Sequence, residues 1–285
     1  MKFGMNLLMW TDTLNDEMLP LLDELKEIGY DAVEIPCFDL DNLDNYAKWG
    51  KRLDELGLSR TGTAVRGPEE NMIDPDAAVR RKGVDANKRN VDCCAAAGCS
   101  VMAGPFHSAL GQFSGKGATE EEWKWGVEST RAAAEYAAQQ GDLIIGIEPL
   151  NRFESHFINI AADAVKFIDD VGLPNVKVHL DAFHMVREEN DIRQAILDAG
   201  DKLGYFHACE NQRGIPGTGL VPWKCVFESF EQIGYDGCVT IESFDPDMAS
   251  IAKLCCIWRK HADSPEQLAT EGLKYLKDVY AEVNG

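Results

Sequence analysis

The sequence predicts an α/β fold of the (β/α)8 TIM barrel type, formed as a single catalytic domain by residues 1–285. Two observations lead to this prediction. An amphipathic helix-like stretch, a glycine and a short apolar run follow one another repeatedly, with the glycines at Gly29, Gly57, Gly98, Gly141, Gly172, Gly200 and Gly234. A further apolar run, KFGMNLL, opens the chain without a preceding helix. The total is therefore eight strands, the number in a closed barrel of roughly 250 residues.

Each strand is expected where an apolar run follows its glycine, because glycine tolerates the left-handed backbone conformation that ends a helix. In chain order these passages are 28–35, 56–64, 97–104, 140–148, 171–181, 199–207 and 233–242, and clear helices are expected at 18–28, 76–97 and 121–140. Strands that alternate with helices pair in parallel. An open doubly wound sheet is the alternative, but no GxGxxG follows the first strand as a dinucleotide site requires.

The composition limits the possible partners. A formal net charge of -20 repels polyanions, which argues against nucleic acid and anionic membranes and leaves cations and a neutral small-molecule substrate. The nine cysteines form no CxxC pair and are expected to be reduced, as in a cytoplasmic protein. Acidic residues soon follow the apolar N-terminal run and no small-residue cleavage site appears, so we expect no secretion signal. No apolar run approaches the roughly 20 residues of a membrane helix.

The last four predicted strands all end in a residue capable of chemistry. The runs LIIGI, VKVHL, KLGYF and CVTI are closed by Glu148, Asp181, His207 and Glu242. Active sites of barrels collect at the C-terminal ends of the strands, although a solvated loop residue or a helix cap explains any one of the four equally well. Three carboxylates brought together would repel one another without a cation. The sequence therefore predicts one divalent metal ion, and oxygen ligands with one nitrogen favour manganese, magnesium or cobalt.

Further polar residues follow these strand ends at short distance. We expect Arg152 and Glu210 to form surface salt bridges and His184 to be a hydrogen-bonded structural residue, since these are the commoner roles of such side chains. The glycines of RGIPGTG favour a turn over a phosphate cradle, because no lysine accompanies them. Candidates for the outer wall of a sugar site, with core packing as the commoner role, are Trp10, Phe106 and His107.

At these residues the sequence resembles a known family. The blocks EPLNRFESH, HLDAFHM, HACENQRGIPGTG and IES, in this order and spacing, resemble the D-tagatose 3-epimerase and D-psicose 3-epimerase family of ketose 3-epimerases, within the sugar isomerase and epimerase superfamily of barrels. The likeness covers most of the chain. It implies a homodimer or homotetramer with one divalent ion per subunit, Mn²⁺ foremost and Co²⁺ or Mg²⁺ as alternatives.

The resemblance also assigns roles to individual residues. It implies that the catalytic acid and base are Glu148 and Glu242, that the metal ligands are Glu148, Asp181, His207 and Glu242, and that substrate contacts come from Glu154, His184 and Arg213. The implied reaction inverts the carbon next to the ketone of a free ketose or keto-sugar through a cis-enediolate. A cation stabilises the enediolate charge, and two carboxylates on opposite faces remove and return the proton.

The identity of the sugar and four other functions stay open at this point. Asn6 stands where the family commonly has an aromatic, Gln212 where it has asparagine and Ile160 where it has threonine. The same fold and metal would serve an aldose-ketose isomerase or an inosose dehydratase. Apurinic-site endonucleases share the barrel but need a basic face and more than the six histidines present. A sugar-binding or inert relative would keep the barrel alone.

Overall fold

Eight parallel strands form a closed barrel with the order β1-β2-β3-β4-β5-β6-β7-β8 in the computed structural model, which describes residues 1–285. The first strand pairs with the second and also with the eighth, which closes the sheet. The predicted (β/α)8 TIM barrel is therefore confirmed. The strands are Lys2–Asn6 (β1), Ala32–Pro36 (β2), Ser59–Thr63 (β3), Val101–Ala103 (β4), Ile144–Ile147 (β5), Val176–Asp181 (β6), Leu203–His207 (β7) and Cys238–Ile241 (β8).

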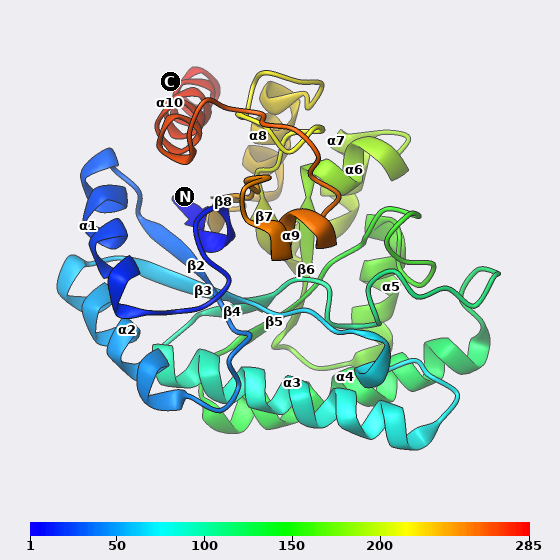
Figure 1. Ribbon diagram of the computed structural model, residues 1–285. Helices are drawn as coiled ribbons and strands as arrows, with labels where there is room; N and C mark the ends of the chain where they lie inside the picture. Colours follow the sequence, from blue (N-terminus) through cyan, green and yellow to red (C-terminus); the bar gives the residue numbers. More distant parts are fainter.

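Helices surround the barrel, and the long pair α3 and α4 runs along one side of it (Figure 1). The C-terminal helix α10 packs against α8 and α1, so the outer ring closes where the two ends of the chain meet. No helix has the combination of length and apolar character that crossing a membrane requires. The α-helices are Leu19–Ile28 (α1), Leu43–Leu56 (α2), Ala77–Ala97 (α3), Glu120–Gln140 (α4), Ala161–Val171 (α5), Ala182–Glu188 (α6), Ile192–Ala199 (α7), Trp223–Ile233 (α8), Ala249–Leu254 (α9) and Pro265–Asn284 (α10). Short 3₁₀ helices occupy Leu7–Met9 (η1), Asp16–Met18 (η2), Pro68–Glu70 (η3) and Gly200–Lys202 (η4).

The predicted glycines do end helices. Left-handed caps with φ between +63° and +107° follow α1, α2, α3, α5 and α8 at Gly29, Gly57, Gly98, Gly172 and Gly234. The two other glycines also have positive φ, 137° at Gly141 and 51° at Gly200, but their ψ angles are not helical. Because a residue with a Cβ is strained in these conformations, glycine marks the passage from a helix to each of the strands β2 to β8.

Polar side chains occupy the interior of the barrel below its C-terminal mouth. Residues two apart on a strand share a face, so His179 lies below Asp181 on β6, and Tyr205 lies below His207 on β7. The rings of His179 and His207 are 4.2 Å apart between centroids, and all four residues are fully buried. The Tyr205 hydroxyl donates a hydrogen bond to Thr240 of β8 at 2.7 Å. This layer of polar groups supports the residues at the mouth.

Candidate active site

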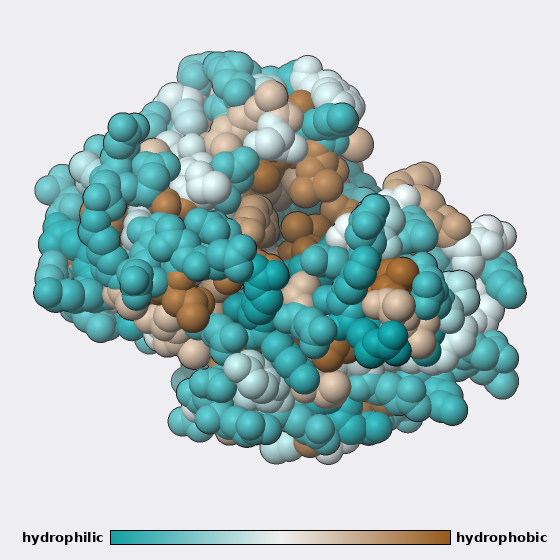
Figure 2. Space-filling model, turned by 60° about the horizontal axis from the view of Figure 1, so that its bottom comes forward, coloured by the Kyte–Doolittle hydropathy of each residue, from teal (hydrophilic) through white to brown (hydrophobic).

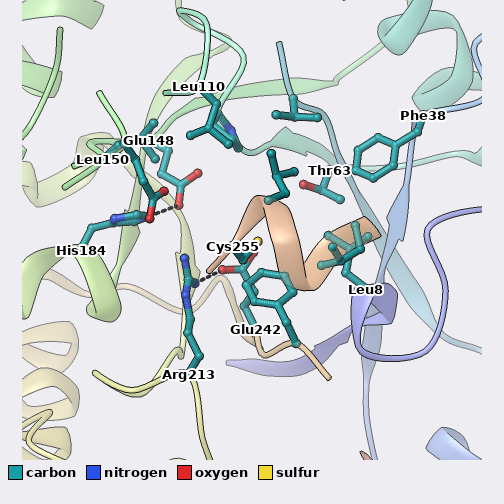
Figure 3. Close-up of a pocket in the computed structure, with 16 residues that line it drawn as sticks. Leu8, Phe38, Thr63, Leu110, Glu148, Leu150, His184, Arg213, Glu242 and Cys255 are labelled. Carbon is teal, nitrogen blue, oxygen red and sulfur yellow. Dashed lines mark hydrogen bonds and ion pairs between the residues drawn. The ribbon is translucent and has the colours of Figure 1, made fainter. Parts of the chain in front are cut away.

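The four predicted metal ligands lie together at the C-terminal mouth of the barrel. Asp181 and His207 are the last residues of β6 and β7, and Glu148 and Glu242 directly follow β5 and β8. Their exposed fractions are 3% for Glu148, 0% for Asp181 and His207, and 8% for Glu242. Figure 3 shows the carboxylates of Glu148 and Glu242 projecting into one pocket from different sides. Strand ends that are far apart in the sequence therefore supply one compact cluster.

Short distances connect the members of this cluster. His207 Nδ1 lies 3.4 Å from Glu242 Oε1. On the other side, His184 Nε2 lies 3.6 Å from Glu148 Oε1 and 3.8 Å from Asp181 Oδ2. The potential ligand atoms form overlapping groups of three within 4.8 Å, namely Glu34, His207 and Glu242; Glu148, Asp181 and His184; Asp181, Cys209 and Glu242; and Glu148, His179 and His207. The predicted ligands are spread over these groups and are not held together in any single one.

Burial changes the acidity of the clustered groups. It raises the pKa of Glu148 well above the ordinary value of a glutamate, and it raises the pKa of Asp181 to about 7 against the opposing charge of Arg213. Burial lowers the pKa of His207, but the charges of Glu34 and Glu242 outweigh it and raise that pKa to about 10. The cluster therefore retains protons at neutral pH, and a cation entering it must displace them.

The residues fit a hard divalent cation. Buried nitrogen atoms are normally hydrogen-bonded, yet His207 Nδ1 has no hydrogen-bond partner while it faces Glu242. A free imidazole nitrogen beside carboxylate oxygens is the donor set that manganese, cobalt and magnesium accept. The sulfur of Cys209 belongs to one of the overlapping groups but hydrogen-bonds Arg213 Nη1 at 3.1 Å. The oxygen and nitrogen donors thus dominate the site.

His184 is a hydrogen-bonded residue, as predicted, and it also faces the pocket. Its Nδ1 accepts the backbone N–H of Asn151 at 2.9 Å, which assigns the ring proton to Nε2. Nε2 then points toward Glu148, an arrangement that Figure 3 shows. Burial lowers the pKa of His184 well below its ordinary value, so the ring is neutral and acts as a hydrogen-bond donor.

Arg213 occupies the same pocket in a strained backbone conformation. Its φ is 65°, a left-handed value that is uncommon outside glycine. Nη1 lies 3.1 Å from Asp181 Oδ2 and makes a close ion pair with Glu242 Oε2. The guanidinium carbon stacks on the rings of Phe183 and Phe244, 3.6 Å and 5.0 Å from their centroids. The predicted substrate residue is therefore placed beside the predicted ligands.

The pocket is polar on one side and apolar on the other. Glu154 lines it and accepts a hydrogen bond from Asn151 Nδ2 at 2.9 Å. The apolar lining comes from several loops, η1 and α9, and includes Leu8, Phe38, Val65, Leu110, Leu150, Phe244, Ile251 and Leu254. Figure 2 shows a hollow in this part of the molecule with apolar surface inside and a largely hydrophilic rim. A ligand held here meets polar groups at one end and hydrocarbon at the other.

The three residues that were candidates for the outer wall of a sugar site do not line this pocket. Trp10 donates its indole N–H to Glu266 at 3.1 Å, and Phe106 is a buried core residue. His107 Nε2 lies 2.8 Å from the backbone oxygen of Glu148. Core packing and support are therefore the roles observed.

The expectation of a surface salt bridge is confirmed for Arg152 and wrong for Glu210. Arg152 pairs with Glu188 at 2.9 Å and is 65% exposed. Glu210 is fully buried. Its carboxylate accepts hydrogen bonds at 2.9 to 3.0 Å from backbone N–H groups of Asn211, Gly217 and Val221 in the following loop, and from the indole N–H of Trp223 at the start of α8. The loop RGIPGTG therefore folds around an internal anion, which explains its glycines without a phosphate.

Two buried residues near the cluster were missed by the sequence analysis. Glu34, on β2, hydrogen-bonds His207 Nε2 at 3.0 Å. His179, two residues before Asp181, lies 3.8 Å from Glu148 Oε2, and both its ring nitrogens lack partners. The available signal was a polar residue inside an apolar run, Glu34 in AVEI and His179 in VKVHL, at a position that can face the barrel interior.

Comparison with known proteins identifies the family. Residues 22–279 match the family described as xylose isomerase-like TIM barrel. The chain is 33% identical over 254 residues to an L-ribulose 3-epimerase of Methylomonas sp. (strain DH-1), a match that covers 88% of each chain. The chain belongs to the ketose 3-epimerase family. Ketose 3-epimerases are carbohydrate epimerases, so this protein is an enzyme of the isomerase class.

A solved ketose 3-epimerase has nearly the same backbone. The D-allulose 3-epimerase from Methylomonas sp., determined in complex with D-allulose, superposes with a TM-score of 0.92 at 30% identity, over 98% of this chain and 97% of that chain. A 3-dehydro-D-guloside 4-epimerase of Escherichia coli (strain K12) is 29% identical over 89% of this chain and 91% of its own. The ketose 3-epimerase family thus has a relative whose reaction centre is a different carbon.

Proposed function

We propose that this chain is a metal-dependent epimerase that inverts the carbon next to the ketone of a free ketose through a cis-enediolate. The observation that carries the proposal is the placement of Glu148 and Glu242, which enter one pocket from β5 and β8 (Figure 3). Asp181 and His207 come from the two intervening strands. Inversion needs proton removal on one face of the substrate and proton return on the other, and two separate carboxylates meet that need.

The cation would be held by Glu148, Asp181, His207 and Glu242, with Mn²⁺ as the first choice and Co²⁺ or Mg²⁺ as alternatives. When bound, it supplies positive charge that stabilises the enediolate oxygens. The donor set supports this assignment, since the three carboxylates and His207, whose Nδ1 is free, belong to overlapping groups of buried potential ligands.

The protein's own groups then handle the proton. The raised pKa of Glu148 suits a group that must both accept and release a proton near neutral pH. His184 Nε2–H and the Arg213 guanidinium lie beside Glu148 and Glu242, where they would donate hydrogen bonds to substrate oxygens that gain negative charge. Glu154, on the same pocket wall, would accept a hydrogen bond from a sugar hydroxyl.

The shape of the pocket supports a small neutral sugar. Polar residues gather at the cluster, while the opposite wall is formed by side chains such as Leu8, Phe38 and Leu110. This wall offers contact to the C–H surface of a sugar and no cationic group for a phosphate. D-Allulose and L-ribulose are the first substrates to test, because they are the sugars named for the matched relatives.

Deuterium incorporation tests the reaction type. The protein is incubated with Mn²⁺ and D-fructose, D-allulose or L-ribulose in deuterated water, and the label is located by NMR. Label at C3 together with the C3 epimer supports the proposal. Label confined to C1 contradicts it and indicates an aldose-ketose isomerase. A separate incubation with an inosose tests the dehydratase alternative, which loss of water would indicate. The 4-epimerase relative gives a further alternative, tested with a 3-keto-glycoside and label at C4.

We also propose that the enzyme forms a homodimer or homotetramer. Phe153 and Trp258 line an open groove beside the pocket, and they are 75% and 74% exposed. Large exposed apolar side chains of this kind are typical of protein interfaces. Light scattering coupled to gel filtration measures the mass, and a monomer at micromolar concentration contradicts this part of the proposal.

A further inference from the structure

Glu34 is a buried carboxylate that the proposed reaction does not use. It lies on β2 inside the barrel and is fully buried. Its Oε1 and Oε2 atoms are 3.0 and 3.2 Å from His207 Nε2. A fully buried carboxylate is costly unless it is paired and hydrogen-bonded, so its position next to a predicted metal ligand calls for an explanation.

Neighbouring side chains hold Glu34 in one orientation. Asn6 Nδ2 donates to Glu34 Oε1 at 2.7 Å, and the Thr61 hydroxyl donates to Oε2 at 3.1 Å. The direction of the Asn6 amide is determined by its other end, because Asn6 Oδ1 accepts the backbone N–H of Leu8 at 2.8 Å. Nδ2 must therefore face the carboxylates. Asn6 Nδ2 also lies 3.4 Å from Glu242 Oε1, so this residue joins Glu34 to a second predicted ligand.

The carboxylate of Glu34 determines which nitrogen of His207 is available. Nε2 points at Glu34, and Nδ1 points toward Glu242 without a hydrogen-bond partner. An imidazole that donates one N–H to a carboxylate presents the lone pair of its other nitrogen to a metal, and such partners fix both the tautomer and the ring orientation. The same geometry is present here before any cation is considered.

We infer that Glu34 is a positioning residue that directs Nδ1 of His207 to the metal, and that Asn6 aligns Glu34 with Glu242. This inference rests on the metal ligands of the proposed function. It gives a role to Asn6, the residue at which this chain departs from the aromatic common in its family. It also explains why a carboxylate stands inside an otherwise apolar strand.

The test is the affinity of Mn²⁺ for Glu34→Gln, measured from the EPR signal of free Mn²⁺. Glutamine fills the same space but removes the charge, and we expect the Kd for Mn²⁺ to rise by roughly 10- to 100-fold. The matched control is Glu122→Gln, because Glu122 also pairs with a histidine, His156 Nε2, at 3.2 Å, but on α4 away from the pocket. Its Kd should equal that of the wild type.

The melting temperature of the metal-free proteins separates positioning from structural support. A merely structural Glu34 would lower the Tm of Glu34→Gln and leave its Kd within twofold of the wild type, and that result overturns the inference. If the variant does not fold, a crystal structure of the Mn²⁺-loaded wild type tests the inference instead. Coordination of the metal by Nδ1 of His207 supports it, and coordination by Nε2 overturns it. Wild-type protein that binds no divalent ion refutes the proposed function itself, whereas an active wild type with an unaffected Glu34→Gln refutes only the role of Glu34.

Discussion

The guanidinium carbon of Arg213 lies 3.6 Å from the centroid of the Phe183 ring, while Nη1 of the same arginine contacts Asp181 and Glu242. The arginine is buried and has a left-handed backbone, so its position depends on these contacts. Stacking on the ring leaves the planar N–H donors free to point at the carboxylates and at a substrate. Phe183 thus links the first turn of α6 to the proposed chemistry.

Phe183→Leu is expected to reduce kcat/KM by roughly 2- to 30-fold, which corresponds to the ~0.5–2 kcal/mol of a cation–π contact. Affinity for Mn²⁺ should stay unchanged, because Phe183 is not among the predicted ligands. Steady-state kinetics with the best ketose and a Mn²⁺ titration measure both quantities. Phe113→Leu, at a phenylalanine that is 48% exposed, is the control. Equal kinetics for the two variants would show that the stacking has no role.

Glu148→Gln and Glu242→Gln are each expected to lower kcat by at least about 100-fold at saturating Mn²⁺, because each removes one of the two proton-transfer groups. Circular dichroism should show folded protein. In deuterated water, a variant that keeps one carboxylate should exchange the C3 proton of one epimer without forming the other. Near-normal turnover by either variant refutes the mechanism with two carboxylates.

Manganese should stabilise the enzyme more as the pH rises toward neutrality. The pKa of Asp181 in the metal-free fold is about 7, above its ordinary 3.8, so its contribution to stability is complete below pH 3.8 and is lost as the pH rises through 7. Binding of Mn²⁺ needs the ionised carboxylate and releases the proton. The difference in Tm with and without Mn²⁺ should therefore increase from pH 5.5 to 7.5. A difference in Tm that does not change with pH would contradict the assignment of Asp181 as a ligand. Groups remote from the site affect the Tm equally with and without Mn²⁺, so they do not contribute to this difference.

Glu210→Gln should destabilise the protein, because an amide cannot accept all the N–H donors that converge on this carboxylate. A buried donor without a partner costs about 1–3 kcal/mol. Urea unfolding measures the loss, and Glu282→Gln, at an exposed ion pair with Lys224, should leave the midpoint unchanged.

Phosphorylated ketoses are expected to bind no better than free ketoses, because the N–H groups of this loop already donate to Glu210. Tight binding of a ketose phosphate would contradict this.

Local patterns in the sequence were sufficient to predict the barrel and the position of its active end. A helix followed by glycine and an apolar run is a feature of about ten consecutive residues, so each of the seven passages could be recognised by itself. Parallel strands joined by helices place their C-terminal ends on one face. The residues that close β5 to β8 could therefore be expected at one mouth, and Glu148, Asp181, His207 and Glu242 do lie there.

Tertiary structure decided which polar groups support that cluster. Asn6, Glu34 and His207 are 28 and 173 positions apart along the chain, and only closure of the barrel brings them into hydrogen-bond distance. A single polar residue in an apolar strand has two possible faces, and the alternation along one strand does not say which face is inside. Glu210 was expected at the surface but is buried, and the reason is again tertiary structure. Its N–H partners come from a loop that folds back over its carboxylate. Local propensity governs the elements, whereas burial and long-range hydrogen bonding determine the environment of each side chain.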